Sequence, residues 1–328
     1  MMIPVEQIAH IKYLLTDSRQ LGAEPEATMF FALKTAKNDG ANYIPELYAK
    51  GVRTFVVNNY WANEANGANR ANEFPSAKFF FVDDTLQALQ ELAAWKRAQF
   101  PDVQVIGITG SNGKTVVKEW LYELLKDDYR IVRSPRSYNS QIGVPLSLWD
   151  IDNNTDLAII EAGISTIGEM DNLQAMIRPT IGIITNLGSE HNDGFDSMEQ
   201  KAQEKAKILN SCECIVYCAD DPLVTHTIAP LVESDVALTM SWSRNHCDAP
   251  LQVDSADRTE KATTLHYTFN DEEGEVVIPF IADRDLDNAI TCLAVLLHLG
   301  LDGDTIARRM AALTPVGTRL NVIEGVNN

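Results

Sequence analysis

The sequence predicts an α/β protein with two parts, a small N-terminal α/β domain and a larger domain built on a doubly wound parallel sheet. From Val103 onward, short apolar runs alternate with amphipathic helical segments, as they do in parallel sheets. A glycine-rich pattern typical of phosphate-binding loops joins the first of these strands to its helix. A length of 328 residues, of which 45% are hydrophobic, also exceeds what one ordinary core accommodates.

Residues 1–100 are predicted to form the smaller domain. Apolar β-rich runs indicate its strands, and the spacing of Leu86, Leu89 and Leu92 indicates one buried helix face. Strands are expected at residues 29–33, 55–57 and 78–82, and helices at residues 44–50 and 84–100. Because Pro101 ends the last helix, we place the domain boundary there.

Residues 101–318 are predicted to form the larger domain. Its strands are expected at residues 103–108, 130–132, 157–161, 181–185 and 214–218. The helices between them are expected at residues 114–126, 143–149, 168–176 and 197–209. A β-rich edge with strands at residues 251–253, 263–269 and 275–280 would precede a last helix at residues 286–299. Ligands of such sheets bind at the carboxyl ends of the strands.

The segment between the first strand and its helix is the most informative motif. Residues 107–115 spell Gly-Ile-Thr-Gly-Ser-Asn-Gly-Lys-Thr, a phosphate-loop pattern with Ile108 where the usual first glycine belongs. Glycines let backbone N–H groups converge on an anion, Lys114 can reach the β and γ phosphates, and Thr115 can offer its hydroxyl to Mg²⁺. The alternative is a glycine-rich turn with a solvated lysine. The expected phosphate-binding residues are Gly110, Ser111, Asn112, Gly113, Lys114 and Thr115.

Composition argues against several classes of function. A net charge of −19 and a pI near 4.6 disfavour binding to nucleic acid or to an anionic membrane surface. The longest apolar stretch, residues 289–297, is far below the roughly 18 to 20 residues that span a bilayer. The N-terminus has no basic segment followed by an apolar one, and the five cysteines form no C-x-x-C pair. We therefore expect a cytoplasmic protein with reduced thiols and no membrane insertion.

Two residues near the carboxyl ends of predicted strands are candidate metal ligands. Glu161 ends the strand at residues 157–161, beside the phosphate loop, where Mg²⁺ needs oxygen ligands. His191 lies in the loop that leaves the next strand at the same edge of the sheet. The alternatives are an ordinary solvent-facing glutamate and a solvated loop histidine.

Three further residues carry no functional signal by themselves. Lys205 lies among charged residues of a predicted helix, a pattern typical of a solvated face. Asn288 has the position of a helix cap, and Arg319 that of an exposed linker residue. Only the wider pattern gives them a role.

Six landmarks taken together resemble the central ATPase domain of the Mur ligases of peptidoglycan synthesis. In the family's order they are residues 107–115, Glu161-Ala-Gly with Gly168-Glu169, Thr185-Asn186 with His191, Glu204-Lys205, Asp287-Asn288-Ala and Gly317-Thr-Arg319. Through Thr16-Asp17-Ser18-Arg19, residues 29–33, Asp39-Gly40 and residues 51–57, the N-terminal part is similar to the UDP-binding domain of this family. Residues 137–146 and 161–169 are most similar to the branch that adds D-alanyl-D-alanine to UDP-N-acetylmuramoyl-tripeptide. The resemblance covers essentially the whole chain.

The resemblance implies roles for single residues. Lys114, His191 and Lys205 would be catalytic, and the metal ligands would be Thr115, Glu161, His191 and Lys205, with Lys205 carbamylated. ATP would contact residues 110–115, Asn288 and Arg319, and the UDP-linked substrate would contact Asp17, Ser18, Arg19, Asn139 and Ser140. One position departs from the family, which usually has an acidic residue two positions after the carbamylated lysine; here that residue is Lys207.

The implied activity is that of an ATP-dependent amide ligase in peptidoglycan precursor synthesis. ATP would phosphorylate the terminal carboxylate of UDP-N-acetylmuramoyl-tripeptide, and the amine of D-alanyl-D-alanine would attack the acyl phosphate. The implied partners are these two substrates, and the protein is expected to be a monomer. Mur ligases have a third domain after the hinge arginine, so residues 319–328 are expected to be a hinge toward a domain absent here. The chain is then expected to bind nucleotide but to ligate weakly or not at all.

Two alternatives stay open. One is another amide ligase with the same ATPase core, such as the branch that adds the third peptide residue, or folylpolyglutamate synthase. The folylpolyglutamate synthases lack a UDP-binding domain of this kind, so binding of a uridine nucleotide would exclude them. The other alternative is a non-catalytic nucleotide-binding module, which ATP hydrolysis without dependence on a muramoyl substrate would favour.

Overall fold

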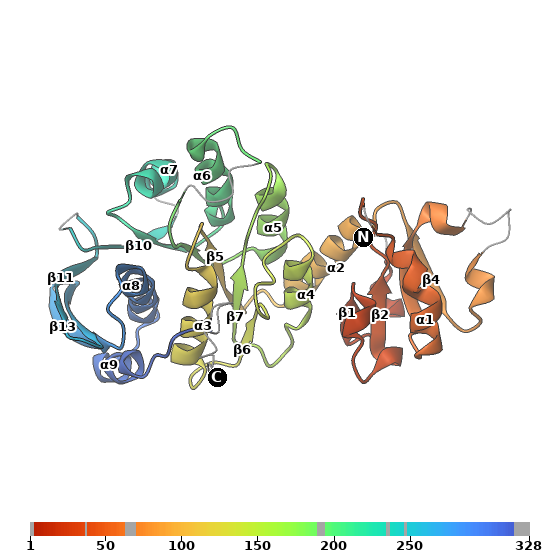
Figure 1. Cartoon of the computed structure of the whole chain (residues 1–328), viewed down its shortest axis with the longest axis horizontal. Helices are drawn as coiled ribbons and strands as arrows, with labels where there is room; N and C mark the ends of the chain where they lie inside the picture. Colours follow the sequence, from red (N-terminus) through yellow and green to blue (C-terminus); the bar gives the residue numbers. More distant parts are fainter. Residues whose placement is uncertain are drawn as a thin grey trace, which may run out of the picture. The chain divides into compact units, whose positions relative to one another are not determined.

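A computed structural model describes residues 3–36, 38–62, 70–188, 194–233, 237–245 and 248–317 (Figure 1). The chain divides into two compact units. The first comprises Met1–Asp102, Tyr138–Asn153 and Ala175–Ile177, and the second comprises Val103–Ser137, Asn154–Gln174 and Arg178–Asn328. Each unit contains its own mostly parallel sheet, so the predicted α/β class is confirmed.

The first unit is built on a four-stranded parallel sheet in the order β1-β2-β3-β4. Its strands are β1 (Tyr13–Leu15), β2 (Thr28–Phe31), β3 (Thr54–Asn58) and β4 (Lys78–Val82). Its helices are α1 (Ile44–Ala49), α2 (Thr85–Ala98) and α4 (Gly143–Trp149). The sequence predicted β2, β3, β4 and these helices, but not β1, which has only three residues and therefore too short a pattern to recognise.

Both faces of this sheet are buried. Met29, Phe31 and Val56 belong to a core on one face, whereas Phe30 and Phe55 belong to a core on the other. This division follows from the two-residue period of a strand, which sends neighbouring side chains to opposite faces. The sheet is therefore a rigid base whose strand ends, rather than faces, are available for ligands.

Helix α2 begins and ends where its sequence specifies. Asp84 Oδ1 accepts hydrogen bonds from Leu86 N at 2.8 Å and Gln87 N at 3.1 Å, which satisfies two free donors of the first turn. Lys96 and Arg97 lie in the last turn, where positive charge is favourable. Helix α4 packs against α2 within the first unit.

The second unit is built on a nine-stranded sheet in the order β13-β12-β11-β10-β9-β8-β5-β7-β6. The strands are β5 (Gln104–Thr109), β6 (Ile131–Arg133), β7 (Leu157–Glu161), β8 (Ile181–Ile184), β9 (Cys214–Cys218), β10 (Leu238–Ser243), β11 (Leu251–Arg258), β12 (Thr263–Phe269) and β13 (Glu272–Ile278). All neighbours from β6 to β11 are parallel, and β12 and β13 continue the sheet antiparallel. The predicted β-rich edge is thus present, and β10 links it to the parallel strands.

The helices of the second unit are α3 (Lys114–Leu125), α5 (Glu169–Ile177), α6 (Met198–Ala206), α7 (Pro222–Glu233), α8 (Asp283–His298) and α9 (Gly303–Ala311). Helices α7 and α9 were not predicted. Helices α3 and α8 contribute to one large core with the sheet, in which the ring of Trp120 stacks on that of Phe280 at 4.7 Å. Figure 1 shows α3 and α8 close together, with α6 and α7 side by side elsewhere in the unit.

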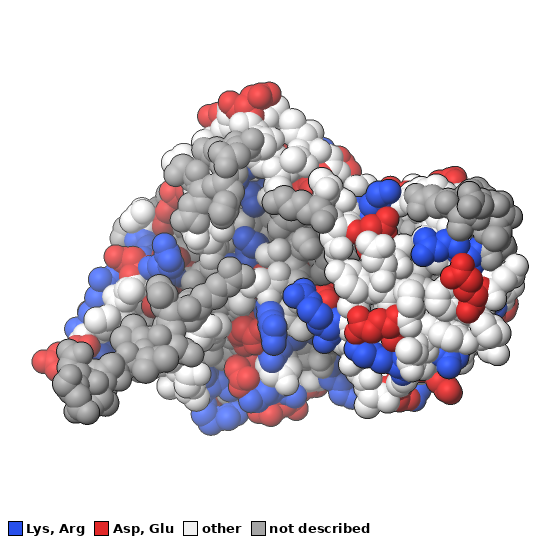
Figure 2. Space-filling view, turned by 45° about the vertical axis from the view of Figure 1, so that its right-hand side comes forward, with Lys and Arg blue, Asp and Glu red and all other residues white. Residues whose placement is uncertain are grey.

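Charged residues of both signs share the surface in Figure 2, and Cys212 and Cys214 are buried. Lysine, arginine, aspartate and glutamate side chains are intermixed on the face in Figure 2 rather than gathered into one basic patch. Cys212, Cys214 and Cys218 are unpaired, and burial raises the pKa of each thiol to about 12. Of the helices in the described ranges, none is long and apolar enough to cross a membrane.

Candidate active site

A glycine-rich loop, residues 110–113, joins β5 to α3. Gly110 and Gly113 have φ angles of 140° and 85°, in the left-handed region that favours glycine. A Cβ on Gly110 would lie 2.0 Å from Thr185 Oγ1, and a Cβ on Gly113 would lie 2.3 Å from Asn288 Oδ1. Both glycines are therefore required by backbone conformation and by the close approach of a neighbouring side chain.

The segment after β8 holds this loop in place. Thr185 Oγ1 donates to Asn112 O, and Asn112 N donates to Asn186 Oδ1 at 3.0 Å. Ser111 N donates to Asn186 O at 2.9 Å, and Ser111 Oγ accepts from Gly188 N at 2.9 Å. Because β5 and β8 are neighbouring parallel strands, their carboxyl ends bring these two segments together.

Lys114 and Thr115 begin helix α3 immediately after the loop. Lys114 Nζ donates to Gly110 O at 2.8 Å and to Ser111 O at 3.3 Å, so the ammonium group lies over the loop. The helix N-terminus adds free N–H groups and a partial positive charge at the same place. Such a loop can bind a phosphate anion.

Glu161 ends β7 with its side chain fully buried, at 0% exposure. Thr115 Oγ1 donates to Glu161 Oε2 at 3.1 Å. Lys118 Nζ, also fully buried, lies 3.0 Å from Glu161 Oε1. The carboxylate is therefore not the solvent-facing group of the alternative interpretation, and it lies beside the hydroxyl expected to contact Mg²⁺.

Lys205 on α6 contacts the same carbonyl oxygen of the loop as Lys114 does. Its side chain is 4% exposed, and its Nζ donates to Gly110 O at 3.0 Å. Lys201, one turn earlier and 3% exposed, donates to Gly188 O at 3.3 Å. Burial, together with the charges of Lys114 and Lys201, lowers the pKa of Lys205 to about 7. Lys205 is thus not on the solvated face that its neighbours suggested.

Lys207, which stands where the family resemblance led us to expect an acidic residue, takes part in an ion-pair network. Its Nζ lies 2.6 Å from Glu204 Oε2 and 2.7 Å from Asp171 Oδ2. Glu204 Oε1 in turn accepts from Gly168 N at 2.7 Å and from Met170 N at 3.2 Å, at the start of α5. Lys207 thus pairs with the Glu204 carboxylate, which caps the start of α5.

A pocket of about 440 Å³ lies beside the phosphate loop. Its lining includes Asn112 and Asn186, together with Asp220 and Trp242 from the β9 and β10 ends and Asn288 from α8. The Asn288 side chain is 4% exposed, and its Nδ2 has no hydrogen-bond acceptor among the described residues. An unsatisfied buried donor of this kind is suited to a polar ligand such as a purine base.

A pocket of about 410 Å³ lies in the first unit at the carboxyl ends of β1 and β2. Its lining residues are Thr16, Asp17, Ser18, Arg19, Leu33, Thr35, Asn38, Gly40, Tyr43 and Ile142. Asp17 accepts hydrogen bonds from Arg19 N at 3.1 Å and Arg19 Nε at 2.9 Å. The Arg19 guanidinium lowers the pKa of the Asp17 carboxyl. The structure thus gathers the three N-terminal candidate residues at one pocket.

The candidates Asn139 and Ser140 are not part of the lining of that pocket. Ser140 Oγ accepts from Gly143 N at 3.2 Å and so helps to begin α4. From the same segment, Ile142 lines the pocket, and Tyr138 Oη donates to Gln20 Oε1 at 3.0 Å. His191 and Arg319, the remaining candidates, lie outside the described residues.

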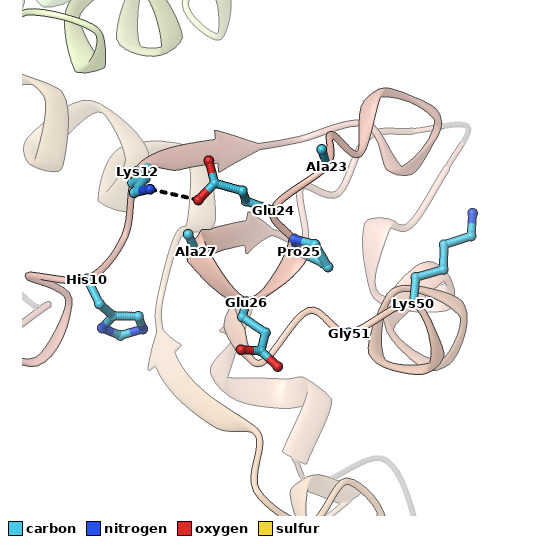
Figure 3. A pocket seen from close by; sticks show the side chains of 9 residues that line it. All are labelled: His10, Lys12, Ala23, Glu24, Pro25, Glu26, Ala27, Lys50 and Gly51. Carbon is cyan, nitrogen blue, oxygen red and sulfur yellow. Dashed lines mark hydrogen bonds and ion pairs between the residues drawn. The ribbon is translucent and has the colours of Figure 1, made fainter.

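Another hollow of the first unit, of about 710 Å³, lies at the opposite ends of the strands (Figure 3). Lys12 precedes β1, Ala27 precedes β2, and Gly51 lies shortly before β3, so the hollow faces the amino ends. Its charged residues lie near the surface, and Lys12 Nζ is paired with Glu24 Oε2 at 2.7 Å. Parallel sheets bind ligands at the other ends of their strands, so the pocket around Asp17 is the better candidate.

Comparison with known families assigns the second unit. Residues 108–296 match the model of the Mur ligase middle domain, which is more than half of the chain. The chain belongs to the Mur ligase family.

Similarity to individual Mur ligases extends over most of the chain. The chain is 30% identical to UDP-N-acetylmuramoyl-tripeptide–D-alanyl-D-alanine ligase of Bacillus subtilis, over 94% of the chain and 63% of that relative. A crystal structure of MurF from Acinetobacter baumannii matches with a TM-score of 0.81 and 23% identity, over 96% of this chain and 66% of that one. MurF ligase from Thermotoga maritima, solved in complex with ADP, matches with a TM-score of 0.76 and 23% identity, over 94% of this chain and 67% of that one. These structures share the fold, and the chain spans less than two thirds of the Bacillus relative.

The Mur ligase phosphate loop has donors that fit Mg²⁺. Among the described residues, no group of three or more histidines, cysteines, aspartates or glutamates has an arrangement that could hold a metal ion. Mg²⁺ does not need such a cluster, because one or two carboxylates, substrate phosphates and water commonly complete its shell. The Thr115 hydroxyl and the buried Glu161 carboxylate, 3.1 Å apart, are suited to hold the ion together with a nucleotide.

Lys118 and Lys201 of this Mur ligase had no role in the sequence interpretation. Lys118 follows Lys114 by four positions and Thr115 by three, so it lies on the same face of α3 as the site. The same spacing relates Lys201 to Lys205 on α6. Helical spacing from the motif residues was therefore the signal that could have identified both lysines.

Proposed function

We propose that this Mur ligase belongs to the branch that joins D-alanyl-D-alanine to UDP-N-acetylmuramoyl-tripeptide. Its second unit would bind ATP and Mg²⁺, and its first unit would bind the UDP-linked substrate. The convergence of Lys114, Thr115, Glu161 and Lys205 at the phosphate loop is the observation that supports nucleotide use most strongly. The name of the Bacillus subtilis relative supports the choice of branch.

We extend this proposal to the individual sites. The pocket beside Asn288 would take the adenine base, and Asp17, Ser18 and Arg19 would bind the uridine part of the substrate. Asn139 and Ser140 would face the muramoyl peptide, and Arg319 would contact the nucleotide. The UDP-linked precursor and ATP are cytoplasmic compounds, and we propose that the protein acts there as a monomer.

The proposed chemistry transfers a phosphoryl group to a carboxylate. A carboxylate oxygen of the tripeptide attacks the γ-phosphorus of ATP, and ADP leaves. The amine of D-alanyl-D-alanine then attacks the acyl carbon, phosphate leaves, and the new amide nitrogen loses a proton. Lys114 and the N–H groups at the start of α3 stabilise the negative charge that accumulates on the phosphoryl oxygens, since two anions must meet in the first step.

Metal binding would involve the chain's own oxygen donors. Thr115 and Glu161 would hold one Mg²⁺, and His191 with a carbamylated Lys205 would hold a second. Bound Mg²⁺ would supply further neutralisation of the phosphates. The lowered pKa of Lys205 supports carbamylation, because only the neutral amine adds to CO2, with release of one proton.

Trapping of the acyl phosphate tests the proposed activity. The chain is incubated with ATP, Mg²⁺ and UDP-N-acetylmuramoyl-tripeptide in the absence of D-alanyl-D-alanine, and borohydride is added. We expect the terminal carboxyl to be reduced to an alcohol, detectable by mass spectrometry. ATP hydrolysis of equal rate with and without the muramoyl substrate would instead indicate a nucleotide-binding module.

Competition between two precursors tests the branch. UDP-N-acetylmuramoyl-tripeptide is expected to displace a labelled uridine nucleotide at lower concentration than UDP-N-acetylmuramoyl-dipeptide does. A preference for the dipeptide would assign the chain to the branch that adds the third residue. Loss of all uridine nucleotide binding would contradict the assignment of the first unit.

A further inference from the structure

Lys118 is a fully enclosed lysine beside the phosphate loop. Its side chain is 0% exposed, and oxygen atoms surround its ammonium group. Nζ lies 3.0 Å from Glu161 Oε1 and 3.0 Å from Glu119 Oε1, and it donates to Ser134 O at 2.7 Å and to Arg136 O. The lysine therefore connects α3, the end of β7 and the segment after β6.

Stability alone does not account for this arrangement. Transfer of an ammonium and a carboxylate from water to the interior costs several kcal/mol per ion, and apolar residues of similar size often stabilise a protein as well or better. Lys118 lies on a helix whose buried neighbours Val117 and Leu121 are apolar. A charged pair at this position therefore needs a role beyond packing.

The pair gives the two oxygens of Glu161 different surroundings. Oε1 forms an ion pair with Lys118 Nζ at 3.0 Å but accepts no well-aligned hydrogen bond, whereas Oε2 accepts a hydrogen bond from Thr115 Oγ1 at 3.1 Å, next to the loop. The backbone of Glu161 is held from the same side, because Glu161 N donates to Ser134 Oγ at 3.2 Å. A turn of the carboxylate would move Oε1 away from the Lys118 ammonium and weaken this ion pair.

The second carboxylate beside Lys118 has a cation of its own. Glu119 lies 3.2 Å from an Nη of Arg133, whose guanidinium is 3.4 Å from the centre of the Tyr122 ring. Glu119 is also partly exposed, with 25% of its side chain accessible, whereas Glu161 is fully buried. The buried charge of Glu161 is therefore the one that depends on Lys118.

We propose that Lys118 is a positioning residue, which fixes the Glu161 carboxylate so that only Oε2 is offered, beside Thr115, to Mg²⁺. This inference rests on the proposed nucleotide and Mg²⁺ site. Lys118 itself contacts neither nucleotide nor ion. Residues that orient metal ligands in this way commonly contribute 10- to 100-fold to metal affinity.

A Lys118→Met variant tests the proposal through Mg²⁺ binding rather than turnover. Calorimetry measures ADP binding in EDTA and over a series of Mg²⁺ concentrations. We expect the Mg²⁺ concentration that gives half of the maximal enhancement of ADP affinity to rise about tenfold or more. The ADP affinity measured in EDTA is expected to change less than twofold. The matched control is Lys126→Met, because Lys126 is an exposed lysine directly after the same helix and pairs with Glu123.

The sign of the effect separates positioning from simple charge. Removal of a nearby positive charge would by itself strengthen Mg²⁺ binding and lower the Mg²⁺ concentration for half-maximal enhancement. A rise in that concentration therefore identifies the loss of orientation. An unchanged or lower Mg²⁺ concentration for half-maximal enhancement in Lys118→Met would overturn the inference. Absence of any Mg²⁺ enhancement in the unsubstituted chain would instead overturn the proposed site, and the inference with it.

Two further variants complete the test, one in case Lys118→Met does not fold and one to show whether Lys118 acts through Glu161. Lys118→Gln keeps a donor for the surrounding carbonyls without the charge, and it replaces Lys118→Met if that variant does not fold. It is also expected to raise the Mg²⁺ concentration for half-maximal enhancement. In a Glu161→Gln background, Lys118→Met is expected to cause no further change in Mg²⁺ dependence. An equal effect in both backgrounds would show that Lys118 acts independently of Glu161 and would contradict the proposal.

Discussion

The side-chain amide of Asn288 on α8 lies against Gly113 of the phosphate loop. A Cβ on Gly113 would lie 2.3 Å from Asn288 Oδ1, closer than any real side chain allows. The amide is buried, and its Nδ2 has no acceptor among the described residues. Residues far apart in the sequence therefore come together, and an unsatisfied donor lies in the lining of the pocket beside the phosphate loop.

Replacement of Asn288 by leucine is expected to weaken ADP binding about tenfold. The amide would otherwise satisfy its Nδ2 on the base, and loss of such a hydrogen bond costs roughly 1–2 kcal/mol. The free energy of unfolding should not fall, because no described protein contact of Nδ2 is lost. Calorimetric titration with ADP measures the effect, and Asn172→Leu, an exposed position on α5, is the control. Unchanged ADP affinity would show that the base does not use Asn288.

Lys205 is expected to make stability depend on pH. Its pKa is lowered from 10.5 to about 7, first by burial and then by Lys114 and Lys201. Between these values the unfolded chain binds a proton that the folded chain has released, so this group makes the free energy of unfolding rise with pH from about 7 to 10.5. Lys205→Met removes the cost of the buried charge. It should stabilise the protein at pH 6.5 and have a smaller effect at pH 9.5.

Urea unfolding at these two pH values, in buffers free of CO2, measures the effect of Lys205→Met. The control is Lys261→Met, because Lys261 is exposed on the second unit. A stabilisation that is the same at both pH values would show that Lys205 is not neutralised on folding.

Glu204 is expected to matter more for stability than its partner Lys207. Its carboxylate accepts two backbone N–H groups at the start of α5, and hydrogen bonds to charged groups contribute about 1.5–3 kcal/mol. Glu204→Ala should therefore lower the free energy of unfolding by roughly 2–3 kcal/mol. Lys207 is one-third exposed, so Lys207→Met should cost under about 1 kcal/mol. Urea unfolding measures both free energies. If the two variants lose equal free energy of unfolding, the Glu204–Lys207 ion pair provides the stability rather than the hydrogen bonds of Glu204 to the start of α5.

Asp17 is expected to control binding of the UDP-linked substrate without affecting ADP. Asp17→Asn removes the charge that holds the Arg19 guanidinium at the pocket of the first unit. Loss of a charge-assisted hydrogen bond of about 1.5 kcal/mol corresponds to roughly tenfold weaker binding of UDP-N-acetylmuramoyl-tripeptide. Glu26→Gln, in the hollow at the opposite strand ends, is the control. If the control weakens substrate binding and Asp17→Asn does not, the two hollows have been assigned the wrong way round.

Much of the fold was predictable because the local pattern is strong. The strands that precede the phosphate loop and Glu161 are continuous apolar runs, and α4 was predicted with its observed bounds. Strand β10 was missed because Leu238–Ser243 mixes polar residues with Met240 and Trp242, and it becomes a strand through its two parallel neighbours. Helix α7 has a proline inside it, a local signal against a helix.

The sequence by itself determined the phosphate loop and the family, because glycine, lysine and threonine at fixed spacing act through the backbone of one short segment. Tertiary structure alone decided what surrounds that loop. The sheet order placed Glu161 and Thr185 at the same edge as the loop, and α6 turned Lys205 inward to Gly110. Lys118 looks in sequence like any other helix lysine, and the role proposed for it rests on its burial against Glu161. Charge in a sequence does not reveal its surroundings, and only folding sets the distances and desolvation that give a buried charge its function.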